Sequence, residues 1–384
     1  MKVAHCPERN ISQSRNIGIA MAAGEIVAFI DDDAIAEPEW LTQLVSVYCD
    51  PEVKGAGGVV YDHTGYRYQY RYSVCDRLGN SRFDLCEAAH EYNFPFSNIF
   101  PYVQGTNSSF ERSALVGIGG FDEEYEFYLD ETDVCCRLVD QGYAIRQLPN
   151  AFVHHKYLPS SIRTSDRVTT NKFPILKNKI YFSIVNNHGH FPLDIVIADG
   201  VRFFDQQRRD LDHHAQAGRI PPLTIEDFTE DVDKAWRIGL TRGLSGERRT
   251  RDPSYFSSPR PFLRCPRIET DGPRRTFVFL SQSFPPLSIG GSARYSVDIA
   301  RAIANLGHNV HVLTRSEGDN TVDLERGVWV HRLAPKAQIP ENLPTGETVP
   351  HHIWNASRTC LEEIERISLF RKIDIIEAPS WDCE

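Results

Sequence analysis

The sequence lacks an apolar run long enough to cross a bilayer, and its first residues do not match a secretory signal peptide. It also lacks an excess of basic charge, since 42 Lys and Arg stand against 52 Asp and Glu, a formal net charge of -10. That balance disfavours nonspecific binding to nucleic acid or anionic lipid. We therefore expect a protein of the cytoplasm without a membrane span; peripheral attachment at the inner face of the membrane is the alternative.

Several motifs are also missing. Nine cysteines are dispersed without Cys-x-x-Cys spacing, which fits reduced thiols better than a disulfide framework. No Gly-x-x-x-x-Gly-Lys loop supports a phosphotransferase, and no Gly-x-Gly-x-x-Gly fingerprint supports dinucleotide binding. With 41% hydrophobic residues and a length of 384, the sequence predicts a globular chain of two domains.

What the sequence does contain is an apolar run, residues 26–30, that ends in the three consecutive carboxylates Asp31, Asp32 and Asp33. This run predicts a buried strand of a parallel sheet, whose carboxyl end is where open α/β sheets place their ligands. Adjacent carboxylates repel one another, and a divalent cation shared with phosphate oxygens relieves the repulsion. The run therefore predicts a site for metal plus diphosphate; the alternative is a solvated turn or a helix cap.

Other motifs surround this acidic triplet in a fixed order. They are Ser14-Arg15-Asn16-Ile17-Gly18 on a predicted helix, Gly57-Gly58-Val59-Val60 on a predicted strand, Gly105-Thr106-Asn107, Gly119-Gly120-Phe121-Asp122, Asp130-Glu131-Thr132-Asp133, and Ala151 to His155. The series resembles the family-2 glycosyltransferases with the nucleotide-sugar-binding GT-A fold, over roughly residues 1–185. Each motif is weak alone, and their order makes the resemblance specific.

The resemblance implies that Asp31 and Asp33 hold Mn²⁺ or Mg²⁺ against the diphosphate of a nucleotide-sugar donor. His155 matches the late histidine that completes the metal shell in the family, and neutral imidazole suits Mn²⁺. Its neighbour His154 is the alternative ligand. Which carboxylate of the triplet touches the metal stays open at this stage.

The resemblance also assigns the catalytic base to the pair Asp130-Glu131, where a carboxylate takes the proton of the acceptor hydroxyl. This chain reverses the usual Glu-Asp order, so either residue can be the base; the position in the motif favours Glu131. The same residues open a predicted helix over residues 132–139, whose acidic first turn suits the helix dipole. The substrate-binding positions implied by the resemblance are Arg15, Asn16, Asp32, Gly105, Asn107 and Asp133.

Beyond residue 155, apolar spacing predicts helices over residues 170–186 and 225–240, which either cover the acceptor side of the cleft or only pack on the sheet. Residues 246–273 are rich in Arg, Pro and Ser with few apolar side chains, which predicts an interdomain linker.

A second domain is expected after this linker. A strand, a helix and a strand are predicted over residues 275–281, 292–306 and 310–314, a Rossmann-like start. The string from Leu280 to Tyr295, with its Gly307-His308-Asn309-Val310 continuation, resembles the N-terminal domain of family-4 glycosyltransferases of the GT-B fold. That resemblance implies that Gly290 and Gly291 border a cleft near the donor phosphates; the alternative is a tight loop that needs glycine for positive φ.

The expected fold class is α/β: a GT-A-like domain over residues 1–245 (core 1–185, helical extension 186–245), a linker over 246–273, and a partial GT-B N-terminal domain over 274–384. The expected function is metal-dependent transfer of a sugar from a nucleotide-sugar donor to a glycan or lipid-linked acceptor, in cell wall polysaccharide or glycoconjugate assembly. Both resemblances are incomplete at the chain ends, so we expect part of a longer bifunctional chain, and both activity and inactivity of this part alone stay open at this stage. The alternative is a noncatalytic carbohydrate- or nucleotide-binding fragment.

Overall fold

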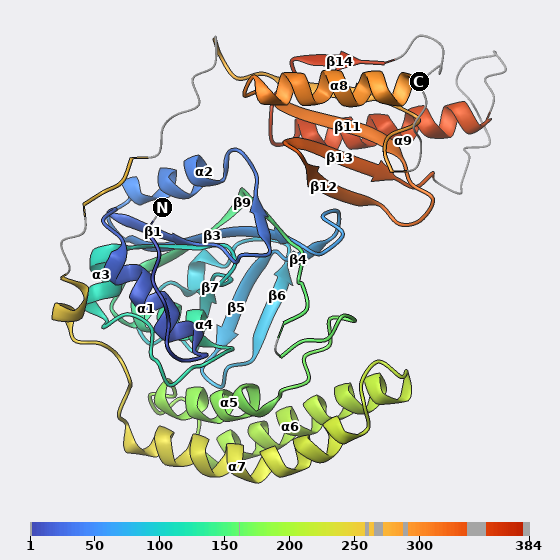
Figure 1. Ribbon diagram of the computed structural model, residues 1–384. Coiled ribbons are helices and arrows are strands. Elements are labelled where there is room, and N and C mark those ends of the chain that lie inside the picture. Colours follow the sequence, from blue (N-terminus) through green and yellow to red (C-terminus); the bar gives the residue numbers. More distant parts are fainter. Residues whose placement is uncertain are drawn as a thin grey trace. The chain divides into compact units, whose positions relative to one another are not determined.

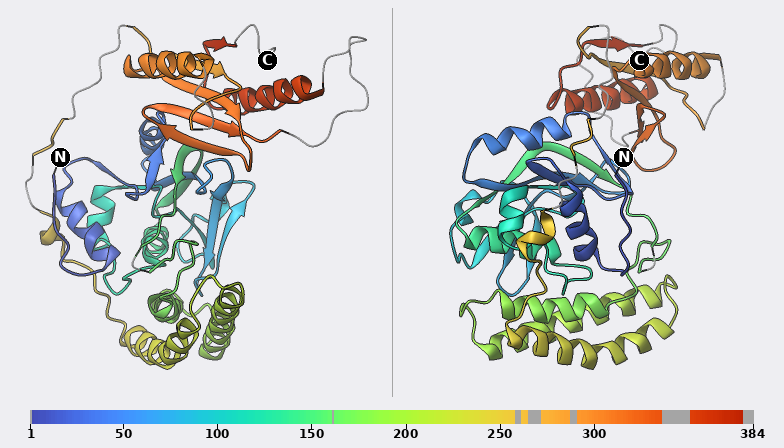
Figure 2. Two further views of the ribbon diagram at one scale, coloured as in Figure 1. Left: turned by 45° about the vertical axis from the view of Figure 1, so that its right-hand side comes forward. Right: turned by 60° about the vertical axis from the view of Figure 1, so that its left-hand side comes forward.

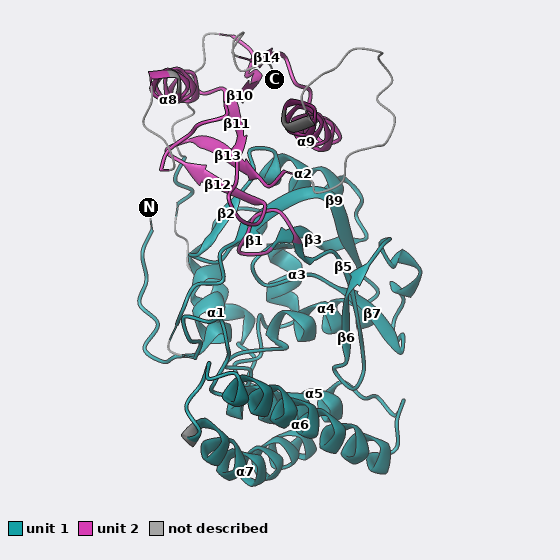
Figure 3. Cartoon of the chain, turned by 90° about the vertical axis from the view of Figure 1, so that its right-hand side faces the viewer, with its two compact units in different colours: residues 1–61, 68–264 teal, residues 62–67, 265–384 magenta. Residues whose placement is uncertain are grey.

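The structure is a computed structural model that describes residues 2–160, 162–257, 261–264, 272–286, 291–335 and 351–378. The chain divides into two compact units, Met1–Tyr61 with Tyr68–Arg264 and Asp62–Arg67 with Cys265–Glu384 (Figure 3). The boundary after Arg264 falls inside the segment that composition predicted as a linker. In the described ranges no helix combines the length and apolar character that a membrane span requires.

A six-stranded mixed sheet forms the centre of the first unit, in the order β1-β8-β3-β9-β2 with β4 paired to β3 (Figure 1). Its strands are β1 (Ile26–Phe29), β2 (Ala34–Ala36), β3 (Val53–Tyr61), β4 (Tyr68–Tyr70), β8 (Ser108–Glu111) and β9 (Ala144–His155). β3 and β9 are parallel, and β1 runs in the same direction because β8 is antiparallel to both β1 and β3. The carboxyl ends of β1 and β9 therefore lie at one edge of the sheet.

The acidic triplet occupies the turn between β1 and β2, as the sequence predicted. β2 turns back and pairs with β9 so that Ala34 stands opposite His155. The expectation of a buried strand in a parallel sheet was wrong in part, since β1 stands at one end of the strand order, its neighbour β8 is antiparallel to it, and only Val27 of its four residues is buried.

Helices flank this sheet. α1 (Ile11–Met21) begins at Asn10, whose side chain accepts from the backbone N–H of Gln13, a standard N-cap. α4 (Asp130–Asp140) begins with the acidic motif. The further elements of the first unit are α2 (Trp40–Ser46), β5 (Tyr72–Asp76), β6 (Ser81–Leu85), β7 (Ile99–Tyr102), α3 (Arg112–Gly117) and α4 (Asp130–Asp140), with 3₁₀ turns at Val47–Cys49, His90–Tyr92 and Pro253–Phe256. β6, β5 and β7 form a separate three-stranded antiparallel sheet.

Three helices follow β9 and pack against one another as a bundle (Figures 1 and 2). They are α5 (Phe173–Val185), α6 (Leu193–Gln216) and α7 (Leu223–Ser245). α5 and α7 match the two predicted helices. α6 lies within the predicted helical extension 186–245, but no separate helix was assigned to it; its buried hydrophobic positions Val196, Phe204 and Leu211 are spaced by seven or eight residues, too sparse for a clear apolar stripe. A buried cluster that includes Leu176 and Ile180 joins the three helices.

Residues 246–257 pack on the first unit, although their composition predicted a solvated linker. Arg248 donates to Asp133 Oδ1 and to Asn186 Oδ1, each at 2.7 Å. Arg251 makes two 2.6 Å hydrogen bonds to the Glu123 carboxylate. The arginines that made this segment look solvated are thus the partners of buried carboxylates, a pairing that composition does not reveal.

Replacing Arg248 by Ala is expected to lower the free energy of unfolding by about 3 kcal/mol, because the buried Asp133 carboxylate would lose one of its two cations. Burial alone would raise the pKa of Asp133, but Arg248 and Arg137 lower it to about 2. A lowered pKa adds stability above the unfolded value and loses it as pH falls toward 2, so the difference between wild type and variant should shrink over that range. Urea unfolding at pH 7 and pH 3 measures it.

The control for this prediction is Arg249→Ala, which removes the same charge from the neighbouring, exposed side chain. An equal loss of stability in both variants would show that general charge, rather than the buried pair, stabilises this segment.

The second unit contains a five-stranded sheet in the order β12-β13-β11-β10-β14, in which only β12 is antiparallel to its neighbour. Its elements are β10 (Thr276–Leu280), α8 (Gly291–Asn305), β11 (Asn309–Arg315), β12 (Thr321–Glu325), β13 (Val328–Leu333), α9 (His351–Ser368) and β14 (Ile375–Glu377). The predicted strand-helix-strand start is present as β10-α8-β11. The sheet then reverses its order at β10, as in Rossmann-like folds.

Two details of this unit concern its edge strand and its glycine pair. β14 stands at one end of the strand order, and its Ile375 and Ile376 are exposed. Gly291 begins α8, and a Cβ built there would meet no atom within 4 Å, so neither space nor positive φ requires glycine at this position. Gly290 lies outside the described residues.

Candidate functional site

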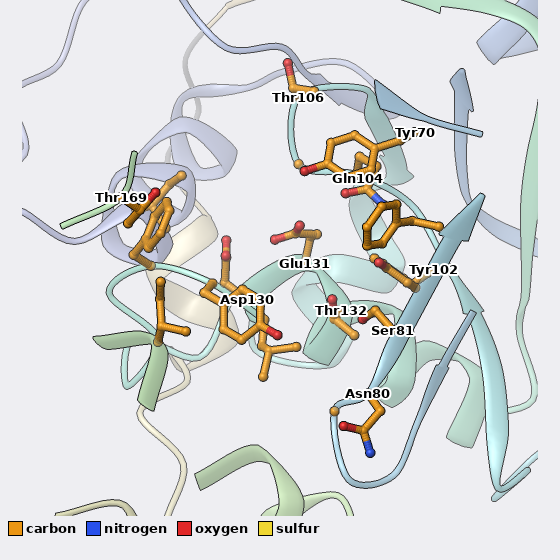
Figure 4. A pocket seen from close by; sticks show the side chains of 18 of the residues that line it. Tyr70, Asn80, Ser81, Tyr102, Gln104, Thr106, Asp130, Glu131, Thr132 and Thr169 are labelled. Atoms are coloured by element: carbon orange, nitrogen blue, oxygen red, sulfur yellow. The ribbon is translucent and has the colours of Figure 1, made fainter. Parts of the chain in front are cut away.

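A cleft of about 880 Å³ opens in the first unit beside the edge where β1 and β9 end. Asp31 and His155 line one part of it, and Arg15, Asp130 and Glu131 line another. Figure 4 shows the carboxylates of Asp130 and Glu131 near each other in the cleft. The sequence motifs for metal and for base thus meet in one cavity.

The metal motif forms a compact ligand set. Asp31, Asp33 and His155 each offer a ligand atom, and these atoms lie within 4.8 Å of one another. His155 Nε2 is 3.2 Å from Asp33 Oδ1 and 3.8 Å from Asp31 Oδ2. Two carboxylate oxygens and an imidazole nitrogen are suitable donors for Mn²⁺. Asp32 is exposed and lies outside this set.

A hydrogen bond to Gln69 orients the imidazole of His155. Gln69 Oε1 is 3.0 Å from His155 Nδ1 and can only accept, so Nδ1 carries the proton and Nε2 presents its lone pair to the two carboxylates. Burial lowers the pKa of His155, although Asp33 acts in the opposite direction. The lowered pKa favours the neutral ring. His154 instead pairs with Glu37 at 2.9 Å, so the geometry favours His155 as the ligand.

The base motif opens α4. Tyr128 and Leu129, just before it, both have positive φ (74° and 66°), a conformation that is strained for such side chains and occurs often at functional sites. Asp130 pairs with Arg15, and only 3% of its side chain is exposed. Glu131 keeps 18% exposure, with its Oε2 3.7 Å from Arg15 Nη1. Burial and the neighbouring Asp130 raise the pKa of Glu131 to about 8, while Arg15 acts in the opposite direction.

Gly105 makes room for this arrangement. A Cβ at this position would collide with the guanidinium of Arg15, so a side chain at residue 105 would displace the cation that holds Asp130. Gly105 and Arg15 both line the cleft.

Three of the expected substrate-binding side chains are not open to a ligand in this structure, because Asn16, Asn107 and Asp133 are fully buried. Asn107 accepts from Trp40 Nε1 and donates to two backbone oxygens, on β3 and β9. Asn16 donates to and accepts from the backbone of Phe121. Asp133 is held by two arginines and an asparagine. These side chains join segments of the fold that carry the site.

Several residues of the cleft gave no signal in the sequence. Gln69 orients His155 from β4, Tyr70 and Gln104 line the cleft in the part that Figure 4 labels, and Arg163 faces it from the loop after β9. α6 contributes Phe203, Gln206 and Gln207. None belongs to a motif with fixed spacing, and each reaches the cleft only through the fold.

Comparisons with known proteins identify similar sequences and structures. Residues 1–115 match the model of "Glycosyl transferase family 2". The chain is 32% identical over 171 residues to the glucosyl-dolichyl phosphate glucuronosyltransferase of Haloferax volcanii, covering 40% of this chain and 50% of that protein. It is 30% identical over 163 residues to the pre-mycofactocin glycosyltransferase of Mycobacterium tuberculosis, covering 41% of this chain and 32% of that protein. The chain therefore spans half or less of the length of these relatives.

Two solved structures are similar at low scores. GalNAc-T7 with UDP, GalNAc and Mn²⁺ aligns at a TM-score of 0.34 with 15% identity, over 50% of this chain and 41% of that one. The mannosyltransferase PcManGT of Pyrobaculum calidifontis, in complex with GDP-Man and Mn²⁺, aligns at 0.33 with 15% identity, over 65% of each chain.

Proposed function

We propose that this chain, whose residues 1–115 match glycosyl transferase family 2, transfers a sugar from a nucleotide-sugar donor to a hydroxyl group of an acceptor. The observation that carries the proposal is the meeting of two acidic motifs, 100 residues apart, in one cleft: the Asp31, Asp33 and His155 ligand set and the Asp130-Glu131 pair. Relatives named as glycosyltransferases, matched over about 40% of this chain, support it.

Asp31, Asp33 and His155 would hold Mn²⁺ or Mg²⁺, and a bound divalent cation neutralises the negative charge of a departing diphosphate. The mixed oxygen and nitrogen donor set favours Mn²⁺ over Mg²⁺, which prefers oxygen. The two solved structures that contain Mn²⁺ with a nucleotide or nucleotide sugar are consistent with this choice of ion.

Glu131 acts as the general base in this proposal. The acceptor oxygen attacks the anomeric carbon, its proton passes to the Glu131 carboxylate, and the bond from the anomeric carbon to the phosphate oxygen breaks with its electron pair leaving on the diphosphate. Asp130 forms an ion pair with Arg15, and this ion pair holds the Asp130-Glu131 segment in place. The raised pKa of Glu131 makes its carboxylate a stronger proton acceptor than an ordinary glutamate.

The acceptor is a glycan or a lipid-linked glycan in this proposal. The aromatic and amide side chains that α6 adds to the cleft, Phe203, Gln206 and Gln207, offer an apolar ring face and hydrogen-bond partners, which suit a sugar. The name of the Haloferax volcanii relative includes a dolichyl-phosphate-linked sugar. For the second unit we propose a partial family-4-like domain, supported by its parallel sheet with reversed strand order.

Isothermal titration calorimetry tests the donor site. Uridine and guanosine diphosphates are titrated into the chain with Mn²⁺ and again with EDTA. We expect micromolar binding of one diphosphate that is lost in EDTA. Absence of binding at millimolar nucleotide in both conditions would contradict the donor site and leave a noncatalytic module.

A further inference from the structure

A cation that has no counter-ion among the described residues faces the cleft from the loop that follows β9. Arg163 lines the cleft together with Asp31, His155 and Tyr157. Its Nη1 donates to the backbone oxygen of Leu158 at 3.0 Å, and its Nε is buried without a hydrogen-bond partner among the described residues. No carboxylate of the described chain forms an ion pair with it.

The other two arginines of the cleft differ in this respect. Arg15 pairs with Asp130, and Arg202 pairs with Asp199. A partly buried guanidinium that lacks an anion costs free energy, because desolvation is not compensated by a partner. An anionic ligand would supply the missing compensation at Arg163.

The loop holds this cation beside the metal ligands. Asp33 accepts from the backbone N–H of Leu158 through Oδ2 at 2.8 Å, and its backbone oxygen accepts from Lys156 at 2.9 Å. The guanidinium of Arg163 stacks 3.4 Å from the ring centroid of Tyr157, whose ring contacts that of His155 at 5.4 Å. Stacking on an aromatic ring fixes the plane of a guanidinium and leaves its edge free for ligands.

Arg163 lies close to the proposed metal ligands. It lines the same cleft as Asp31 and His155, and the ring of Tyr157 contacts both its guanidinium and the imidazole of His155. The anion that Arg163 would bind is therefore one that also lies close to the metal ligands.

We propose that Arg163 binds the diphosphate of the nucleotide-sugar donor, as a second cationic group beside the metal ligands. This rests on the proposed function and adds a residue to it. A planar guanidinium can donate to two phosphate oxygens at once in a fixed geometry, whereas the ammonium group of a lysine acts as a point charge. During transfer the same contact stabilises the charge that collects on the departing diphosphate.

The test uses Arg163→Ala and Arg163→Lys with Mn²⁺ and the nucleoside diphosphate that wild type binds. A charge-assisted contact to phosphate predicts that Arg163→Ala weakens diphosphate binding by roughly 10- to 100-fold, with Arg163→Lys intermediate because it keeps the charge but loses the planar fork. Affinity for Mn²⁺ alone, measured by electron paramagnetic resonance without nucleotide, should not fall. The corresponding nucleoside should bind equally to wild type and both variants.

Arg167→Ala is the matched control, since it removes the same charge from an exposed position of the same loop. Unchanged diphosphate affinity in Arg163→Ala would overturn the inference. A parallel loss of Mn²⁺ affinity would also overturn it, because that result means that Arg163 only holds the loop against Asp33. If wild type binds no diphosphate, the proposed function fails first, and the inference fails with it.

Discussion

Asp33→Ala is expected to lower Mn²⁺ affinity at least about 100-fold and to abolish sugar transfer by any form of the protein that is active. Asp33 has two roles in the structure: its Oδ1 is 3.2 Å from His155 Nε2, and its Oδ2 accepts from the backbone N–H of Leu158. The variant therefore removes a metal ligand and releases the loop after β9. Electron paramagnetic resonance of bound Mn²⁺ and calorimetry with nucleoside diphosphates measure the effect.

Asp33→Asn separates the two roles. The amide oxygen can still accept from Leu158, but the ligand charge is gone, so Mn²⁺ affinity should fall nearly as far as in the alanine variant while the stability of the fold is kept. Glu25→Ala removes an exposed carboxylate just before the amino end of β1 and should change neither quantity. Retained Mn²⁺ affinity in Asp33→Asn would show that the cluster is a structural turn, as Asp-rich turns often are.

The parts of the site that the sequence predicted well are those fixed by strand direction. Asp31 and Asp33 follow β1, and His155 ends β9; because these strands run the same way, their ends share an edge of the sheet. The helix that carries Glu131 was likewise expected from its acidic first turn and apolar spacing. At these positions the local sequence pattern and the sheet topology agree. The sequence therefore predicts which of these side chains lie close together.

The sequence motifs could not distinguish residues that contact a ligand from residues that support the fold. Asn16 and Asn107 lie in motifs that resemble a substrate-binding series, yet both side chains are buried and bonded to the backbone. A motif records that a residue type is needed and does not record why. Arg248 is an example of the opposite error. Its basic segment with few apolar residues predicted a linker, whereas the Arg248 side chain forms an ion pair with the buried Asp133.

Arg163 and Gln69 are residues near the metal ligands that no sequence pattern predicted. Gln69 acts on His155 through a contact between segments that are 86 residues apart in sequence, whereas Arg163 lines the cleft from the loop after β9, where it contacts Tyr157 and Leu158. Neither lies at a strand end or in a repeating pattern, and no local signal distinguishes them from other loop residues. Their positions follow only from how β4 and the loop after β9 are placed around the cleft.

Glu131→Gln is expected to lower kcat by about 10²- to 10⁴-fold, the usual contribution of a general base, with little change in diphosphate affinity. The amide has nearly the same shape but cannot take a proton. Steady-state transfer kinetics together with calorimetry separate the two effects. A loss of diphosphate binding equal to the loss of kcat would point to a role in holding the donor instead.

The pH dependence of transfer distinguishes Glu131 from Asp130 as the base. Burial and Asp130 raise the pKa of Glu131 to about 8, and a base works only when deprotonated, so kcat should rise about tenfold per pH unit below that value and level off above it. Asp130→Asn removes one cause of the raised pKa and frees Arg15 to act on Glu131. The inflection should therefore move to lower pH with the plateau largely kept. A lost plateau in Asp130→Asn, with the pH profile of Glu131→Gln unchanged from wild type, would instead make Asp130 the base and Glu131 the neighbour that tunes it.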